Sequence, residues 1–308
     1  MNKYRTMILE GLQKRYPTYE IKVETMKKNN GCAYEGICMR ESQEVCCVPI
    51  IPCRLYEELL EYGELTLEEV LDEMEMVLKE HVEVGSMSFT DWEQVKESLI
   101  IRVINYEKNA ELLQEVPHRR ILDLAVTYRI TVTVTESVEG SALVTNRYLD
   151  IWGITEEELF TTAYQNMFQT EEVSIQPLTK ILFDMAELVG YDIEGLKLLK
   201  QVPQAKEVMY LAKVGLLWGG GVCFLQKEAF QKFAEEKDSD IYILPSSTQE
   251  LILVLEKYKF AEEVLKDMVK DMVKDINESM VSEEEILSNH VYLYQRETNE
   301  IVDLGEAQ

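Results

Sequence analysis

Tight-turn signals separate short apolar runs along much of this chain, and they restrict the kinds of sheet that it can form. Asn29-Asn30-Gly31 lies between two alternating segments, where Asn-Gly is a strong signal for a β-hairpin. Further turn signals are Glu139-Gly140, Gly219-Gly220-Gly221 and Thr298-Asn299-Glu300. Hairpins join antiparallel strands, and amphipathic helical segments interrupt them without a βαβ rhythm. The sequence therefore predicts an α+β fold with mainly antiparallel sheets and flanking amphipathic helices.

The chain length allows more than one domain. With 308 residues, it is sufficient for one large or two medium domains. We expect two sub-domains, an N-terminal α+β region at residues 1–99 and a C-terminal α+β region at residues 100–308. A strand–turn–strand–helix order occurs twice in the second region, which suggests two related lobes at residues 100–170 and 171–308.

Three segments of the C-terminal region have strong secondary-structure patterns. The run Ile121–Glu136 is rich in β-branched residues and predicts one long strand. The segment Asn105–Val116 predicts a helix that ends before a proline. The stretch Glu207–Leu255 combines apolar runs with the glycine triplet, which predicts a hairpin loop followed by a strand at Val222–Leu225. A further strand in this stretch leads to Pro245-Ser246-Ser247.

The chain is strongly acidic. It has 57 acidic and 31 basic residues and a net charge of −26. This charge repels phosphate backbones and anionic membrane surfaces, so we expect neither nucleic-acid binding through a basic patch nor membrane association. The acids recur at helical spacing, which favours a solvated acidic surface over a face for a basic partner. There is no apolar leader at the start and no run long enough to span a bilayer, so we expect a cytoplasmic protein.

Several segments, in this order along the chain, carry a family resemblance. They are Pro49-Ile50-Ile51, Asn105-Tyr106-Glu107-Lys108-Asn109, Val116-Pro117-His118-Arg119, Ile121-Leu122-Asp123-Leu124-Ala125, Asn146-Arg147-Tyr148-Leu149, Trp152-Gly153-Ile154, Ala163 with Asn166, Tyr242-Ile243-Leu244-Pro245-Ser246-Ser247, Leu287-Ser288 and Val291-Tyr292. Together they resemble an uncharacterised bacterial family, a domain of unknown function common in anaerobic Gram-positive bacteria. The resemblance implies a cytoplasmic protein and one family-length unit, and it implies no activity. Relatives carry Pro-Ser-Ser-x-His-Glu where this chain has Gln249 in place of the histidine.

Cysteine and histidine spacing does not match a metal site. Five of the six cysteines lie between Cys32 and Cys53, but no pair has the C-x₂₋₄-C spacing of structural zinc ligands. We therefore interpret these cysteines as small buried apolar residues. The three histidines match no zinc-hydrolase motif. The glycine triplet also lacks the residues of a phosphate-binding loop. We expect neither a metal nor a cofactor.

Two groups of residues remain as candidate binding residues. Ser246, Ser247 and Glu250 follow a predicted strand, and His118 and Arg119 begin a basic segment in a chain poor in bases. No complete catalytic arrangement is present, so we name no catalytic residue. Our leading interpretation is a non-enzymatic cytoplasmic binding or interaction protein with an unknown protein partner. The alternatives are a hydrolase-type enzyme that uses these five residues, and an acidic mimic of nucleic acid.

Overall fold

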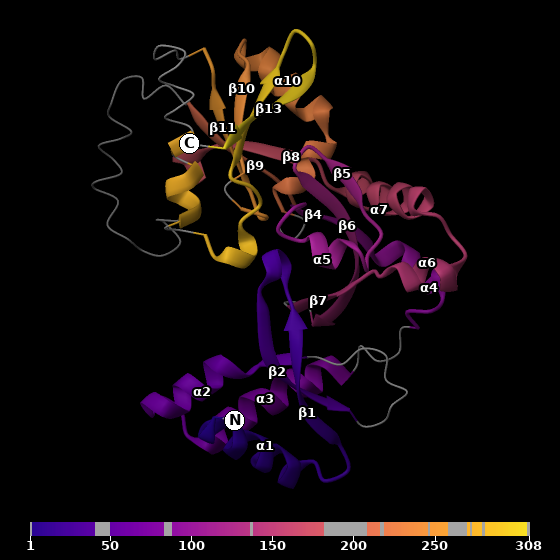
Figure 1. Cartoon of the computed structure of the whole chain (residues 1–308), viewed down its shortest axis with the longest axis vertical. Coiled ribbons are helices and arrows are strands. Elements are labelled where there is room, and N and C mark those ends of the chain that lie inside the picture. Colours follow the sequence, from indigo (N-terminus) through magenta and orange to yellow (C-terminus); the bar gives the residue numbers. More distant parts are fainter. Residues whose placement is uncertain are drawn as a thin grey trace. The chain divides into compact units, whose positions relative to one another are not determined.

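The computed structural model describes most of the chain. The described residues are 2–40, 50–82, 88–135, 138–181, 208–215, 219–245, 247–257, 270–271, 273–278 and 281–306. They belong to two compact units. The first unit is Met1–Ile100, Glu115–Pro117 and Tyr128–Ala163, and the second is Ile101–Gln114, His118–Thr127 and Tyr164–Gln308. Helices accompany three antiparallel sheets, so the predicted α+β class is confirmed (Figure 1).

The N-terminal sheet is built on the predicted Asn-Gly hairpin. Strands β1 (Glu20–Lys27) and β2 (Ala33–Arg40) pair in an antiparallel arrangement, and the short strand β3 (Ile50–Pro52) pairs with β2. Asn30 and Gly31 in the connection have φ values of 58° and 74°. Both residue types tolerate this left-handed conformation, which explains why the turn forms here.

Three helices pack with the N-terminal sheet around one apolar core. They are α1 (Lys3–Arg15), α2 (Cys53–Tyr62) and α3 (Leu67–Val82). Buried residues from all of these elements form the core, namely Ile8, Leu12, Ile37, Met39, Ile51, Cys53, Val70, Leu71 and Met74. The apolar residues that recur at helical spacing in α1 and α3 therefore face the sheet. Helix α3 starts with a capping box in which Thr66 and Glu69 bond to each other's main chain and side chain.

A four-stranded sheet follows in the sequence. Its strands are β4 (Leu99–Asn105), β5 (Arg119–Ile121), β6 (Leu124–Thr135) and β7 (Val138–Leu143). The order is β4-β6-β5, with β7 also paired to β6. The prediction of one long strand from Ile121 was wrong, because a tight turn at Leu122 and Asp123 divides it into β5 and β6. Leu122 adopts a φ of 56°, which no β-propensity pattern indicates.

The helix predicted over Asn105–Val116 was also wrong in its extent. Asn105 is the last residue of β4, and only the short helix α5 (Ala110–Leu113) follows. The Asn105 side chain accepts a hydrogen bond from the Lys108 main chain, at 2.9 Å. The Asn109 side chain donates to the Asn105 carbonyl at 2.8 Å. Such side-chain bonds to the main chain compete with helix formation.

Short helices flank the four-stranded sheet in the sequence. They are α4 (Trp92–Val95), the 3₁₀ turn η3 (Lys96–Ser98), α6 (Asn146–Trp152) and α7 (Glu156–Thr170). In the first unit, the Trp152 ring stacks near Tyr148 and donates through Nε1 to the Phe89 carbonyl at 2.9 Å. A capping box of Thr155 and Glu158 starts α7.

A six-stranded antiparallel sheet is the centre of the second unit. Its order is β13-β12-β10-β11-β9-β8. The strands are β8 (Val173–Pro177), β9 (Met209–Val214), β10 (Ile241–Leu244), β11 (Leu251–Leu255), β12 (His290–Gln295) and β13 (Glu300–Glu306). All four residues of β10 are buried. A strand buried on both faces requires cover on each side of the sheet.

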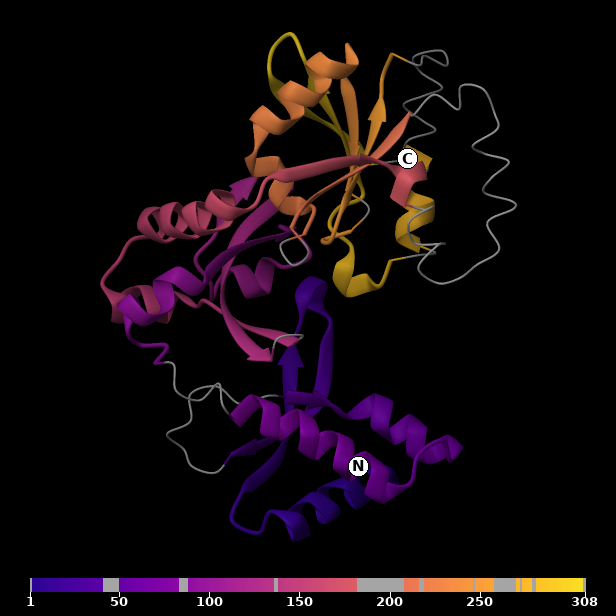
Figure 2. The same cartoon turned by 180° about the vertical axis from the view of Figure 1, so that it is seen from behind.

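Two different helical segments cover the two faces of this sheet (Figures 1 and 2). Helix α10 (Lys227–Lys237) places Phe233 against Tyr210 and Phe230 against Tyr294. Val273, from the helical residues 273–278, packs on the other face in a core with Tyr242, Leu244, Val254 and Val291. The alternation of side chains along β10 and β12 thus supplies two cores from one sheet.

The glycine triplet is a close-packing feature of the second unit. The segment after it is the 3₁₀ helix η4 (Gly221–Leu225), so the strand predicted at Val222–Leu225 was wrong. A Cβ added at Gly220 would lie 2.4 Å from the Glu250 Cα, and one at Gly219 would lie 2.2 Å from the Thr248 carbonyl oxygen. The Gly220 amide donates to that carbonyl at 3.0 Å. The glycines are therefore needed where two main-chain segments touch.

Among the helices that the structure describes, none has both the length and the apolar character that crossing a membrane requires.

Candidate functional site

The β5–β6 turn places a carboxylate in the interior of the second unit. Asp123 is 8% exposed, and it accepts hydrogen bonds from two side chains near the start of β12. Ser288 Oγ donates to Oδ2 at 2.6 Å, and the Tyr292 hydroxyl donates to Oδ1. Burial, followed by the charge of Asp123, raises the pKa of Tyr292, so its hydroxyl stays protonated as a donor. We call Asp123, Ser288 and Tyr292 the Asp123 cluster.

A histidine and a second carboxylate lie beside the Asp123 cluster. His290 begins β12, and its Nδ1 lies 2.8 Å from Asp303 Oδ2 on the neighbouring strand β13. The register of these strands shifts between His290 and Tyr292, and Gly305 has a φ of 74°. The Gly305 amide donates to Asp303 Oδ1 at 2.7 Å. The bulge therefore fixes the orientation of the Asp303 carboxylate.

These two features bring three potential metal-binding side chains together. Asp123, His290 and Asp303 each offer one ligand atom, and these atoms all lie within 4.8 Å of one another. The three residues come from segments far apart in the sequence. They are the residues of the described chain that could hold a metal ion by this criterion.

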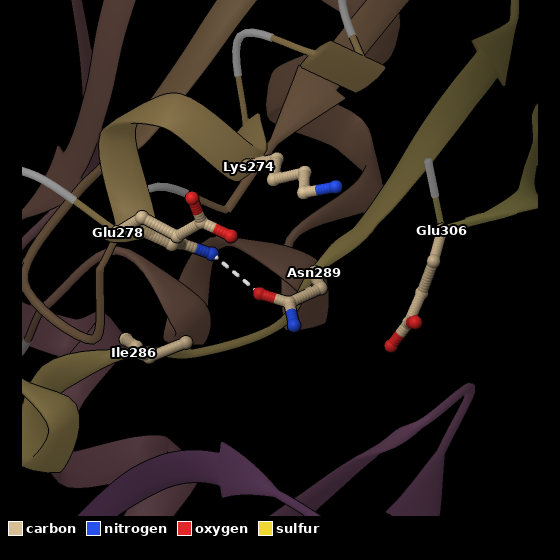
Figure 3. A pocket seen from close by; sticks show the side chains of 6 residues that line it. Lys274, Glu278, Ile286, Asn289 and Glu306 are labelled. Atoms are coloured by element: carbon tan, nitrogen blue, oxygen red, sulfur yellow. Dashed lines mark hydrogen bonds between the residues drawn. The ribbon is translucent and has the colours of Figure 1, made fainter. Parts of the chain in front are cut away.

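A cavity of about 250 Å³ opens where the residues before β12 meet the end of β13. Its walls are formed by Lys274, Asn277, Glu278, Ile286, Asn289 and Glu306. Figure 3 shows the charged ends of Lys274, Glu278 and Glu306 around the Asn289 side chain. The lining is mostly polar and charged, with one apolar side chain. The cavity thus suits a small polar molecule rather than a large apolar one.

Asn277 is the buried polar residue of this cavity wall, with 4% exposure. Its Nδ2 donates to the Ser288 carbonyl at 3.0 Å and to Asn289 Oδ1 at 2.8 Å. The second of these bonds is the dashed line to Asn289 in Figure 3. Two acceptors on the nitrogen fix the orientation of the amide. Its Oδ1 is buried and has no hydrogen-bond donor among the described residues. A buried acceptor without a donor costs free energy, so a bound donor that reached this atom would be stabilising. The oxygen is closed to solvent in this structure, so the cavity wall must move slightly for a ligand to reach it.

The predicted serine group forms a local turn. Ser246 lies outside the described residues. Ser247 is buried, and its Oγ accepts a hydrogen bond from the Gln249 amide at 3.1 Å. The Ser247 amide in turn donates to the Glu250 carbonyl. Burial raises the pKa of Glu250. The described contacts of Ser247 are those of a turn-stabilising serine.

The predicted basic group lies on and before β5. His118 packs near the Tyr106 ring, with centroids 6.1 Å apart, and Arg120 lies 4.3 Å above the same ring. Arg119 is in β5 and pairs with Val126 of β6. None of the described residues of these two groups lines the cavity described above. The proposal that these five residues form a hydrolase site therefore stays a prediction, as does nucleic-acid mimicry.

Two of the three described cysteines of the N-terminal group are buried, as the sequence predicted. Cys38 and Cys53 are buried, whereas Cys32 is half-buried. Burial raises the pKa of Cys53 to about 11, which disfavours the thiolate that binds metals. Cys46 and Cys47 lie outside the described residues.

Sequence reasoning missed the residues of the cavity and of the Asp123 cluster. The segments of the family resemblance contain Asp123, Ser288 and Tyr292. No spacing rule indicates that these three residues form one site. One available signal was the residue pair Leu122-Asp123, because an aspartate inside a β-rich run marks a turn. Asn277 had no such signal, since it lies within an acidic helical pattern.

The comparisons with known proteins identify the family. The model of DUF5688, a family of unknown function, matches residues 1–296. Since this match covers nearly the whole chain, the chain belongs to that family. Neither the comparison with curated proteins nor the comparison with solved structures gave a match.

Proposed function

We propose that this member of the DUF5688 family is a non-enzymatic binding protein for a small zwitterionic molecule of amino-acid type, held in the Asn277 cavity. The observation that carries the proposal is the buried Asn277 Oδ1, which has no donor among the described residues. An ammonium group supplies the hydrogen-bond donors that this oxygen lacks. Its charge also matches the nearby carboxylates of Glu278 and Glu306.

Lys274 indicates which chemical group the ligand carries opposite its ammonium group. The exposed Lys274 ammonium lines the same cavity and attracts a carboxylate. Asn289 supports this polarity, because its Oδ1 accepts from Asn277 and its Nδ2 is therefore oriented as a separate donor. Ile286 offers one small apolar contact. A cavity of about 250 Å³ is smaller than the usual sites for drug-sized ligands, which favours a compact ligand.

Binding is tested by calorimetric titration of the full chain with each standard amino acid and with putrescine, a diamine without a carboxylate. We expect saturable 1:1 binding of at least one amino acid and none of putrescine. Lys274→Ala should weaken that binding at least tenfold, because it removes the partner of the ligand carboxylate. Lys270→Ala is the matched control, since Lys270 lies one helical turn earlier and does not line the cavity.

Asn277→Asp is the second variant. It keeps the size of the side chain but puts an oxygen where Nδ2 donates to the Ser288 carbonyl and to Asn289 Oδ1, so we expect weaker amino-acid binding and lower stability. Circular dichroism checks the fold. The proposal is overturned if no amino acid binds, if putrescine binds as well as the amino acids, or if Lys274→Ala and Lys270→Ala bind equally.

A further inference from the structure

We infer that Asp123, His290 and Asp303 form a binding site for a divalent transition-metal ion, with Zn²⁺ as its probe. The three ligands are not residues of the proposed amino-acid cavity, although Glu306 of the cavity wall lies beside His290. It starts from one imidazole and two carboxylates whose ligand atoms lie within 4.8 Å of one another. The Nδ1 of His290 and Oδ2 of Asp303 are 2.8 Å apart. At this distance the two groups are in hydrogen-bond contact. A tetrahedral ion with bonds of about 2.1 Å needs its ligand atoms about 3.4 Å apart, so a small movement of the Asp303 carboxylate would admit the ion.

The charge and the ligand types both favour such an ion. Two carboxylates with a neutral imidazole carry two negative charges, which one divalent cation balances. Imidazole nitrogen selects transition ions, whereas Mg²⁺ and Ca²⁺ prefer sites made of oxygen alone. The net charge of −26 also raises the local concentration of cations around the whole chain.

Both carboxylates accept hydrogen bonds from neighbouring donors, as metal-ligating carboxylates generally do. Asp123 accepts one bond on each oxygen, from Tyr292 and from Ser288. Each carboxylate oxygen has a second lone pair, so these bonds leave capacity for a metal. Asp303 is fixed in the same way by the Gly305 amide, at 2.7 Å. The donors therefore orient the ligands without using up their coordinating capacity.

His290 also has a carboxylate near its second ring nitrogen. Its Nε2 lies 3.8 Å from Glu306 Oε1, on the side opposite the nitrogen that faces Asp303. With Nδ1 on the ion, Nε2 carries the proton, and Glu306 is placed to accept it in a hydrogen bond after a small side-chain movement. A carboxylate behind a ligating histidine is the common outer-sphere arrangement, and it fixes the tautomer. Ser288 adds a further constraint, because its Oγ accepts from the His290 amide at 2.9 Å.

The site is tested by calorimetric titration of chelator-treated full chain with Zn²⁺ and, separately, with Mg²⁺. We expect one Zn²⁺ per chain and at least a tenfold weaker affinity in His290→Ala and in Asp303→Asn. Both side chains are partly exposed, with 26% and 30% relative exposure, so these variants are expected to fold. His118→Ala is the matched control, because this histidine packs near Tyr106 and is not one of the three ligands.

The Zn²⁺ titration can either support or overturn the inferred metal site. Absence of saturable Zn²⁺ binding overturns the inference, as does Zn²⁺ binding that survives both ligand substitutions, which cysteine thiols would give. Tighter binding of Mg²⁺ than of Zn²⁺ overturns the assignment of the metal class. Lys274→Ala should leave Zn²⁺ binding unchanged while it weakens amino-acid binding, so the two proposals can fail separately.

Discussion

The Tyr292 hydroxyl donates a hydrogen bond to the carboxylate of Asp123, which lies 169 residues earlier in the chain. Tyr292 is fully buried, and Asp123 is nearly so. The contact connects the β5–β6 turn to the six-stranded sheet within the second unit. It therefore fixes the position of a carboxylate that both the cluster and the inferred metal site require.

Removal of this hydroxyl should destabilise the protein. Tyr292→Phe keeps the ring, which lies 5.0 Å from Phe224, but leaves one Asp123 oxygen without its donor. We expect a loss of about 2 kcal/mol in the free energy of unfolding. Tyr294→Phe is the control, because its hydroxyl donates to Asn299 in a partly buried turn, and its loss should be below about 1 kcal/mol. Urea denaturation measures both, and equal losses would contradict the special role of Asp123.

The ion pair between Arg5 and Glu57 should stabilise the first unit more than exposed pairs do. The two side chains have relative exposures of 15% and 9%, and Asn2 also donates to Glu57 at 2.8 Å. Arg5→Ala leaves the Glu57 carboxylate without its main partner, so we expect a cost of about 3 kcal/mol. Arg54→Ala removes an exposed pair with Glu58 on α2 and should change stability by less than about 0.5 kcal/mol.

Chemical denaturation of the two arginine variants is the measurement. A similar, small loss of stability in both variants would show that water solvates the Glu57 carboxylate in place of Arg5. The predicted difference would then be wrong.

Close packing at the glycine triplet predicts a severe effect of a single methyl group. In Gly220→Ala, the new Cβ would lie 2.4 Å from the Glu250 Cα, so one of the two main-chain segments must move. We expect a loss of about 3 kcal/mol. Gly153→Ala is the comparison, because Gly153 has a φ of 67° but open space at the Cβ position, and strain alone should cost about 1 kcal/mol. Thermal denaturation ranks the two, and the reverse order would refute the packing argument.

The capping box of α7 predicts a stability change that depends on pH. Hydrogen bonds from Thr155 hold the pKa of Glu158 below its ordinary value of 4.5. A carboxyl whose pKa is lower in the folded state stabilises the protein above its unfolded pKa and loses this effect as pH falls through the folded pKa. Glu158→Gln should therefore be less stable than the natural chain at neutral pH, and this difference should shrink as the pH falls well below 4.5.

Glu157→Gln is the matched control for this helix start. It removes the same charge from the first turn of α7 but leaves the Thr155–Glu158 hydrogen bonds in place. Denaturant titrations at neutral pH and well below pH 4.5 should show a smaller pH-dependent difference for Glu157→Gln. An equal difference would assign the effect to the helix dipole rather than to the box.

Structural features that depend on a few neighbouring residues could be predicted from the sequence. The Asn29-Asn30-Gly31 hairpin formed as predicted, because the atoms that stabilise it lie within a few residues. The capping boxes of Thr66 and Thr155 depend on local contacts in the same way. The α+β class followed for the same reason, since recurrent hairpins require antiparallel sheets. Errors arose at Leu122 and at Gly219–Gly221, where contacts with distant segments determine the local conformation.

The candidate sites were decided by the tertiary structure alone. Asp123 meets Ser288 across 165 residues of sequence, and Asn277 reaches Ser288 from a separate helical segment. Side-chain periodicity specifies which face of a strand or helix is buried, but it does not specify which other segment covers that face. The sequence by itself therefore determined the fold class, the Asn-Gly hairpin and the net charge of −26. Sheet order and the two-sided packing of the six-stranded sheet determined which polar groups are buried together.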